Sequence, residues 1–220
     1  MRTNSHLPCS YFRSILIFTL ILIMSQAIYS QSFLSGFGIE IGGGYNQLLW
    51  QVPLSLSSSN DTRFNRTHFD LTPEVRIKYA IQVRTNIYCS PFLGYNRFGG
   101  QSNKGTDGYQ DEIWFDAFDL GFIASYQVSR LSFGVGYKAN RHNNITGWYH
   151  SPSNPDDNFN WTSEFRTWSH NVGIRISYEL WYFSIAGESW FGISELQGSG
   201  YLAPTTIRQN HFRLFLGYTI

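Results

Sequence analysis

Two adjacent residues have the side chains that acyl-transfer chemistry needs. Ser169 and His170 lie shortly after Glu164, and a serine nucleophile requires a histidine base within hydrogen-bond reach. The run around them alternates apolar and polar residues, which is typical of a β-strand, so adjacent side chains point to opposite faces. The residues that share a face with His170 are Trp168 and Val172. We therefore expect no catalytic residues here and no enzyme activity.

A second group has the side chains of a divalent metal site. His68, Asp70 and Glu74 lie at alternate positions and therefore share one face of a strand, while Asp116 and Asp119 lie elsewhere. Imidazole and carboxylate groups are common ligands of divalent cations. The same residues also suit a polar barrel interior and the bases of loops. We expect this second role, with no metal and no cofactor.

Charged residues recur at every second position of the alternating runs, so they share one parity, that is, one face of each predicted strand. Ten glycines share this parity, and glycine covers a solvent face poorly but leaves room for long side chains in a crowded interior. Four acids and five bases can pair there, as buried charge requires. We predict that these nine residues line the interior of a closed barrel: Glu40, Glu74, Arg76, Lys78, Asp119, Lys138, Arg175, Glu188 and Arg213.

Four segments repeat one pattern, two apolar residues and then tyrosine at alternate positions. The segments are 75–79, 122–126, 174–178 and 214–218. Tyrosine favours the headgroup level of a membrane, because its ring is apolar and its hydroxyl is polar. We predict an interface girdle of Tyr79, Tyr126, Tyr178 and Tyr218. Five other aromatics form either a second girdle or a ligand-binding surface: Trp148, Tyr149, Phe159, Trp161 and Tyr201.

Four further alternating runs separate these segments, at about 33–49, 86–98, 131–140 and 181–193. The connections alternate in length, with short ones at 80–85, 127–130 and 179–180 and long ones at 51–65, 99–111, 141–163 and 194–206. This predicts an all-β fold, a closed eight-stranded antiparallel up-and-down transmembrane β-barrel with short periplasmic turns and long extracellular loops. Six residues are expected to face lipid: Phe122, Phe133, Ile174, Ile185, Leu214 and Leu216.

Two prolines lie inside predicted strands, where proline cannot donate to the ladder of hydrogen bonds. If the second hairpin centres on residues 81–83, Pro73 and Pro91 lie at similar heights on neighbouring strands. One local bulge would then accommodate both. The alternative is that one of the strands is broken.

The first thirty residues have the features of a secretory signal peptide. Arg2 and Arg13 are basic, and the eleven residues from Ser14 to Met24 are an apolar run too short to span a membrane. Cleavage is expected after Ala27 or Ser30, which leaves residues 31–220 as one barrel domain. The sequence thus predicts export through the Sec pathway.

The composition of the exported part excludes several classes of protein. The signal removes two of the 16 basic residues and none of the 15 acidic ones, so the net charge is slightly negative and argues against nucleic acid. Cys89 is its only cysteine, which excludes a scaffold held by disulfides. Aromatic residues make up 18% of the chain and charged residues only 14%, which suits a transmembrane barrel.

The last ten residues carry a resemblance to a known family. Their apolar members alternate with polar or small ones, and a free apolar edge of this kind invites aggregation unless it closes a barrel. The pattern resembles the C-terminal insertion signal of bacterial outer-membrane barrels, although Ile220 stands where those proteins usually have an aromatic residue. The predicted insertion signal consists of Phe212, Leu214, Leu216, Tyr218 and Ile220.

The whole exported chain thus resembles the small eight-stranded outer-membrane barrels of the OmpA/OmpX type, without a peptidoglycan-binding domain. The resemblance implies a Gram-negative outer-membrane location, insertion by the barrel-assembly machinery, and a structural or adhesive role in the envelope. We expect a monomer in contact with lipid and lipopolysaccharide, with an unknown extracellular ligand.

Three alternatives remain: a narrow pore or small-solute channel, a lipid A-modifying barrel enzyme, and a soluble lipocalin-like carrier. The carrier would place the apolar parity inside and the charges outside. The observation that decides between the carrier and the membrane barrel is therefore which of the two alternating sets of residues is solvent-accessible in a structure.

Overall fold

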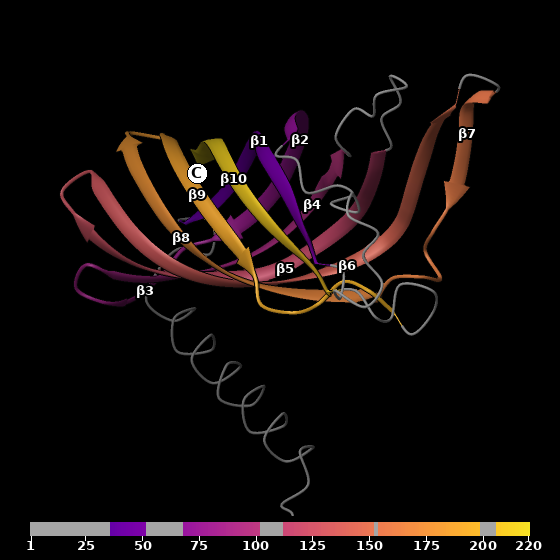
Figure 1. The fold of residues 1–220 in the computed structure, drawn as a ribbon. Helices are drawn as coiled ribbons and strands as arrows, with labels where there is room; N and C mark the ends of the chain where they lie inside the picture. Colours follow the sequence, from indigo (N-terminus) through magenta and orange to yellow (C-terminus); the bar gives the residue numbers. More distant parts are fainter. Residues whose placement is uncertain (1–35, 52–67, 102–111, 152–153, 199–205) are drawn as a thin grey trace, which may run out of the picture.

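Ten strands form from the alternating runs. The computed structural model describes residues 36–51, 68–101, 112–151, 154–198 and 206–220, so the predicted signal peptide and its cleavage sites lie outside the described residues. The strands are β1 (Phe37–Gln51), β2 (His68–Tyr79), β3 (Ile81–Arg84), β4 (Ile87–Gln101), β5 (Glu112–Val128), β6 (Leu131–Ser151), β7 (Asn154–Asn160), β8 (Trp168–Leu180), β9 (Phe183–Gly192) and β10 (Thr206–Thr219) (Figure 1).

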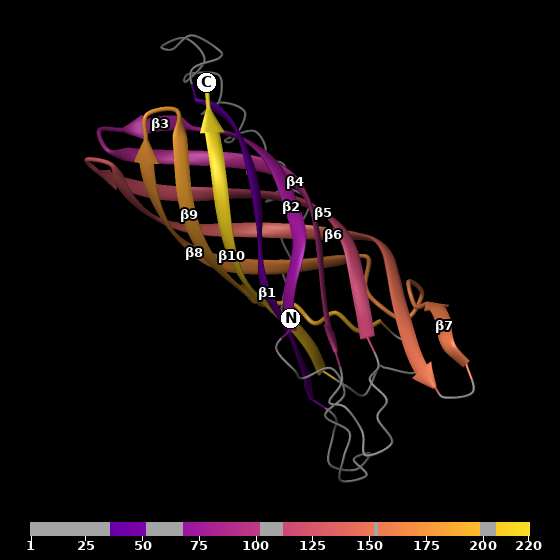
Figure 2. The ribbon, with the colours of Figure 1, turned by 90° about the horizontal axis from the view of Figure 1, so that it is seen from above.

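The strands close into an eight-membered antiparallel barrel. Each strand pairs with its neighbours in the order β2-β1-β10-β9-β8-β6-β5-β4, and a further pairing between β2 and β4 closes the circle. β3 continues β2 along β4, so these two strands share one of the eight positions. β7 pairs only with the far end of β6 and lies beyond the barrel wall (Figure 2). The predicted eight-stranded closed barrel is confirmed.

Pro91 separates β2 from β3 without breaking β4. The pairs Lys78–Phe92 and Ile81–Cys89 belong to one register, and the ladder lapses between them, where Pro91 has no N–H group to donate. The amide of Ala80 bonds the carbonyl of Gly36 instead, at 2.8 Å. β4 runs on, because its other edge pairs with β5 through this region.

Pro73 lies at a different height, so the prediction of one shared bulge is wrong. Glu74 pairs with Gly42 and Asp70 with Gly44, so four residue steps on β2 oppose two on β1. Pro73 lies inside this bulge, where the ladder needs no donor from it. Each proline therefore has its own irregularity. One lies at Pro73, and the other lies opposite Pro91, six residues further along the chain that begins with β2.

Three tight turns join strands at the end of the barrel where the chain also finishes. They lie at 85–86, 129–130 and 181–182, which corrects the predicted hairpin centre at 81–83 and the predicted start of a strand at Trp181. Each turn holds one residue in the left-handed region, Asn86 at φ 64°, Ser129 at φ 57° and Trp181 at φ 57°. Positive φ matches the twist of a two-residue hairpin.

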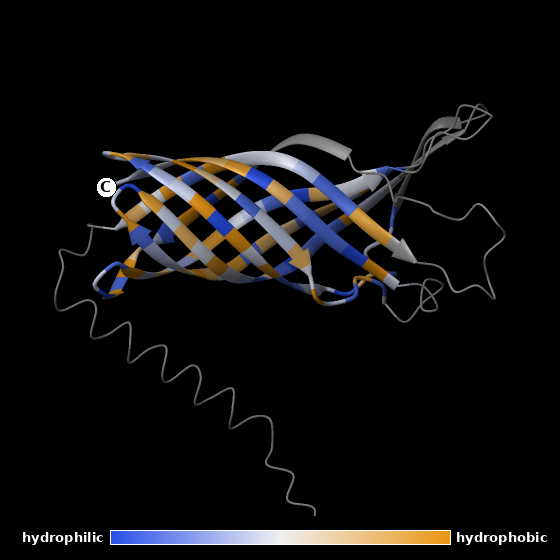
Figure 3. Ribbon diagram, turned by 60° about the vertical axis from the view of Figure 1, so that its left-hand side comes forward, coloured by the Kyte–Doolittle hydropathy of each residue, from blue (hydrophilic) through white to orange (hydrophobic). Residues whose placement is uncertain are grey.

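The apolar parity faces outward and the charged parity faces inward. The ribbon shows apolar stripes alternating with polar ones around the wall (Figure 3). The six residues expected to face lipid are all exposed on the outer wall, whereas the charged residues of the opposite parity are buried inside, with Lys78 half-buried. This arrangement rules out the lipocalin-like carrier. No helix in the described part of the chain is long and apolar enough to cross a membrane.

Arginine on the outer wall should cost most midway between the two rims. Ile174 lies four residues from Tyr178 at the short-turn rim and four from His170 toward the other end. We expect Ile174→Arg to reduce the free energy of unfolding in lipid vesicles by about 2–4 kcal/mol, because the charge enters hydrocarbon, and Ile176→Arg to cost less. Equilibrium guanidinium titration measures both. Equal costs at the two positions would contradict this placement of the membrane.

The opposite end contains more β-structure than the sequence suggested. The predicted loop at 141–163 is mostly strand, since β6 reaches Ser151 and β7 folds back along it from Asn154. Loops 52–67 and 102–111 lie outside the described residues, as do Tyr201 and the side chains of Trp148, Tyr149 and Phe159. β4, β5, β6 and β7 therefore form a four-stranded extension past the closed part of the barrel (Figure 1).

Candidate functional site in the barrel lumen

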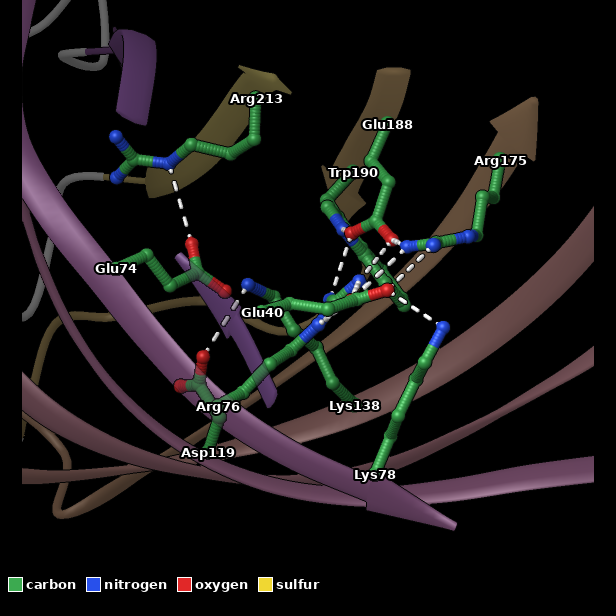
Figure 4. A network of polar contacts seen from close by, with 10 residues as sticks. All are labelled: Glu40, Glu74, Arg76, Lys78, Asp119, Lys138, Arg175, Glu188, Trp190 and Arg213. Atoms are coloured by element: carbon green, nitrogen blue, oxygen red, sulfur yellow. Dashed lines mark hydrogen bonds and ion pairs between the residues drawn. The ribbon is translucent and has the colours of Figure 1, made fainter. Parts of the chain in front are cut away.

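Four charged side chains meet across the lumen nearer the short-turn end. They come from β1, β2, β8 and β9. All four point inward, and the register pairs Glu40 with Arg76 and Arg175 with Glu188. The Arg76 Nε atom donates to Glu40 at 2.6 Å, and its Nη1 atom donates to Glu188 at 2.9 Å. Arg175 donates to both carboxylates, at 2.6 Å to Glu40 and 2.5 Å to Glu188 (Figure 4). We call these four residues the lumen network.

Two further side chains complete the coordination of the network. The Lys78 ammonium contacts a Glu40 oxygen at 2.6 Å, and the Trp190 indole N–H donates to Glu188 at 2.8 Å. All four carboxylate oxygens are thereby engaged. The three cations exceed the two carboxylates by one charge.

Aromatic rings hold the network from both sides. The Arg76 guanidinium lies 4.0 Å from the centre of the Phe215 ring and 4.9 Å from that of Phe92, within the range of cation–π attraction. The Trp190 ring lies so close to Gly136 and Gly173 that a Cβ there would come within 2.8 Å and 2.5 Å of it. These two glycines therefore make room for an aromatic ring and not only for charged side chains.

Two more ion pairs lie further from the short-turn end. The Lys138 ammonium is 3.5 Å from Asp119, which also accepts a bond from Asn96 at 2.5 Å. Arg213 lies 3.3 Å from Glu74 and donates to Asn46 at 2.8 Å. The structure therefore brings all nine predicted lumen residues into ion pairs.

Beyond the ion pairs, apolar side chains fill the lumen. Phe165 and Leu196 enter it from the segments that follow β7 and β9. These segments are tied together by the Arg166 N–H to Leu196 carbonyl bond and the Gly198 N–H to Glu164 carbonyl bond, both at 2.7 Å. We call this cluster the apolar plug: Leu48, Phe98, Ile113, Phe115, Ala117, Ile145, Phe165, Leu196 and Ile207. Leu196 lies in the predicted loop 194–206 and Phe165 just after the predicted loop 141–163, and the plug itself was not predicted.

A serine–histidine pair does exist, although not the adjacent one considered from the sequence. Ser169 points inward and is buried, while His170 lies on the outer parity and bonds Tyr137 at 2.6 Å. His142 Nε2 lies 3.0 Å from Ser169 Oγ, and His142 Nδ1 lies 2.7 Å from the Arg166 carbonyl, which is the geometry of a nucleophile and an oriented base.

This pair is enclosed by the lumen. Ser169 is 1% exposed and His142 4% exposed, so a substrate carbonyl has no path to the hydroxyl. The Phe98 and Phe115 rings of the apolar plug pack edge-on against the imidazole, with ring centres 5.8 Å and 5.4 Å away. Gln209 gives Ser169 a further hydrogen bond at 3.1 Å. The pair thus serves as a satisfied polar contact beneath the plug.

The remaining predicted site residues lie on the outer wall. Tyr126, Tyr178 and Tyr218 are exposed near the short-turn end, and Tyr79 is half-buried. The residues of the predicted insertion signal are exposed along one face of β10 and just past it. Among the described residues, no group of three or more metal-binding side chains occurs, and Glu74 pairs with Arg213. The side chains of His68 and Asp70 lie outside the described residues.

Comparison with known proteins shows no match to a protein-family model and none to a curated protein. Solved structures similar to the chain include Ail, the attachment invasion locus protein of Yersinia pestis, at 10% identity and a TM-score of 0.44, covering 84% of this chain and 99% of Ail. Neisserial surface protein A is similar at 8% identity and a TM-score of 0.45, covering 84% and 98%. The outer membrane protease OmpT of Escherichia coli is similar at 11% identity and 0.44, covering 87% and 99%.

The class of the molecule follows from its own geometry. A closed ladder leaves no free edge among the eight barrel positions, the outer wall is an apolar band, and the charges are paired inside. A bilayer demands these features of any spanning sheet, because backbone groups cannot bond to water there. The chain is an eight-stranded transmembrane β-barrel of the outer-membrane type.

Proposed function

We propose that this barrel has a structural or surface-interaction role in the bacterial outer membrane and does not conduct solutes. The lumen network carries the proposal, because Arg76 bonds Glu188 and Arg175 bonds Glu40 across the interior, between strands that are not neighbours. The apolar plug fills a second level with buried side chains. A solute would have to break buried ion pairs and displace packed rings, and both costs oppose a narrow pore or channel.

The extension of β4, β5, β6 and β7 supports display at the surface. It projects on the side opposite the short turns, which in this class is the extracellular side. Its described side chains include Arg97, Glu112 and Trp114, and arginine and aromatic residues are enriched in binding interfaces.

The proposed partners follow from the outer wall and from β10. Lipid and lipopolysaccharide cover the apolar band, and the exposed alternating residues of β10 serve the barrel-assembly machinery during insertion. Eight positions close the sheet, so a monomer is complete as a folded unit.

Planar-bilayer recording tests the closed lumen. We expect the purified, refolded barrel to give no reproducible conductance steps, because the lumen network and the apolar plug block the path in series. The control is a heat-dependent gel shift, which shows that the same preparation is folded. Reproducible nanosiemens-scale steps from folded protein would reject the proposal in favour of a pore.

A further inference from the structure

A polar cavity of about 240 Å³ lies between the lumen network and the short-turn end. Its wall includes Lys78, Arg175 and four serines, Ser90, Ser125, Ser132 and Ser177. We call it the basal cavity. Since one water takes up roughly 30 Å³ of liquid volume, the space suits several waters or one small ion with its hydration.

Short side chains leave this space open. Ser132 and Ser177 are direct partners across β6 and β8, and Ser125 pairs with Gly134 across β5 and β6. In an eight-stranded barrel the interior is filled only where side chains are large enough to meet. Hydroxyl groups in place of apolar side chains make the wall a source of hydrogen-bond donors.

The two cations at the inner end of the cavity have donors to spare. Glu40 and Glu188 already accept bonds at all four oxygens, and three cations share them. The Lys78 ammonium has three N–H groups, and among the described residues its ion-pair partner is Glu40. Arg175 uses Nη1 and Nη2 toward the carboxylates and faces the cavity as well.

A carboxylate also lines the cavity, and it must be counted. Glu179 is exposed at the end of β8 and accepts a hydrogen bond from Gln127 at 2.9 Å. Water therefore screens its charge, whereas the excess positive charge of Arg76, Lys78 and Arg175 lies deeper in the lumen. The inner end of the cavity is positive and its mouth carries one solvated acid.

We propose that the basal cavity binds a small tetrahedral oxyanion, of the phosphate or sulfate type, from the periplasmic side. The ammonium of Lys78 and the guanidinium of Arg175 supply charge-assisted donors, and the serine hydroxyls complete the shell. The bound anion neutralises the excess charge of the lumen network. This site is independent of the proposed surface role, because it lies at the opposite end of the barrel.

Titration calorimetry with inorganic phosphate tests the proposal on the folded full barrel in neutral detergent at low chloride. We expect saturable binding of one phosphate per barrel. Lys78→Gln should weaken it about tenfold, because a charge-assisted hydrogen bond is lost. Glu179→Gln should strengthen it about threefold, because a like charge leaves the mouth. Arg84→Gln, at an exposed position on the same rim outside the cavity wall, is the matched control and should bind as the parent does.

The results of this titration test the phosphate site independently of the conductance experiment. The heat-dependent gel shift shows whether each variant is folded, and Glu179→Gln changes an exposed side chain, so its effect is measurable even if Lys78→Gln fails to fold. Absence of saturable phosphate binding by the parent overturns the site. So does a Glu179→Gln barrel that binds phosphate no more tightly than the parent, or a folded Lys78→Gln barrel that binds as the parent does.

Discussion

Glu188→Ala is expected to destabilise the folded barrel by about 3–5 kcal/mol, because removing one member of a buried ionic cluster leaves charges uncompensated. Three side chains lose Glu188 as an acceptor at once: Arg76, Arg175 and the indole of Trp190. The remaining Glu40 would then face three cations. Equilibrium urea unfolding in vesicles, followed by tryptophan fluorescence, measures the change.

Two variants show whether the loss comes from unpaired charge. Glu179→Ala removes an exposed carboxylate with one hydrogen bond to Gln127, and it should cost no more than about 1 kcal/mol. Arg76→Met combined with Glu188→Leu removes one charge of each sign, and apolar replacement of a buried pair is often neutral or stabilising. The double variant should therefore be more stable than Glu188→Ala alone. If Glu188→Ala and Glu179→Ala cost the same, the lumen network is not a stabilising cluster.

The face of each residue could be predicted from the sequence, because alternation has a period of two whatever the pairing of the strands. The inward placement of Arg175 and the outward placement of Ile174 follow from this rule alone. Trp190 obeys it too, since it shares its parity with Glu188 and points inward. It was missed because the interior was expected to hold charges and glycines, whereas rings occupy much of it.

Only part of the charge pairing follows from register, since side-chain length counts as much. Glu40 lies opposite Arg76 and Arg175 opposite Glu188, and both of these pairs form. Glu188 lies directly opposite Arg213 across β9 and β10, yet Arg213 pairs with Glu74. Arg76 reaches Glu188 from β2, across the lumen. Such contacts depend on how several long side chains share one enclosed space, and no pairwise spacing in the chain contains that information.

The two residues that enter the apolar plug from outside the strands left no periodic signal. Phe165 and Leu196 are single apolar residues in segments rich in polar ones, and two hydrogen bonds between the segments hold them in the lumen. Hydrophobic periodicity identifies strands and helices and not isolated residues of this kind. The prolines differ again, because each affects only its own local pairing, and their heights depend on a hairpin centre that composition alone does not fix.

Deleting residues 217–220 is expected to abolish stable insertion. These residues complete the seam of the barrel: Gly217 pairs with Glu40 and with Ser184, and Tyr218 pairs with Ile39 and Phe183. The amide of Ile220 also bonds the Phe37 carbonyl at 2.9 Å. Without them the ends of β1 and β9 would present unpaired groups to hydrocarbon, at several kcal/mol each. We expect the shortened chain to remain in the periplasm as a protease substrate, measured as its fraction in the outer-membrane pellet.

Side-chain variants separate the pairing of β10 from its proposed role as an insertion signal. Tyr218→Ser with Ile220→Ser leaves every backbone bond of the seam possible and removes two exposed side chains of the pattern. If the assembly machinery recognises that pattern, this double variant inserts poorly, yet the purified chain refolds in detergent because its ladder is intact. Ile220→Phe should insert at least as well as the parent. Normal insertion of the double serine variant would show that this strand serves in pairing and not as a signal. Normal insertion of the deleted chain would contradict both roles, because insertion would then require neither the seam nor the signal.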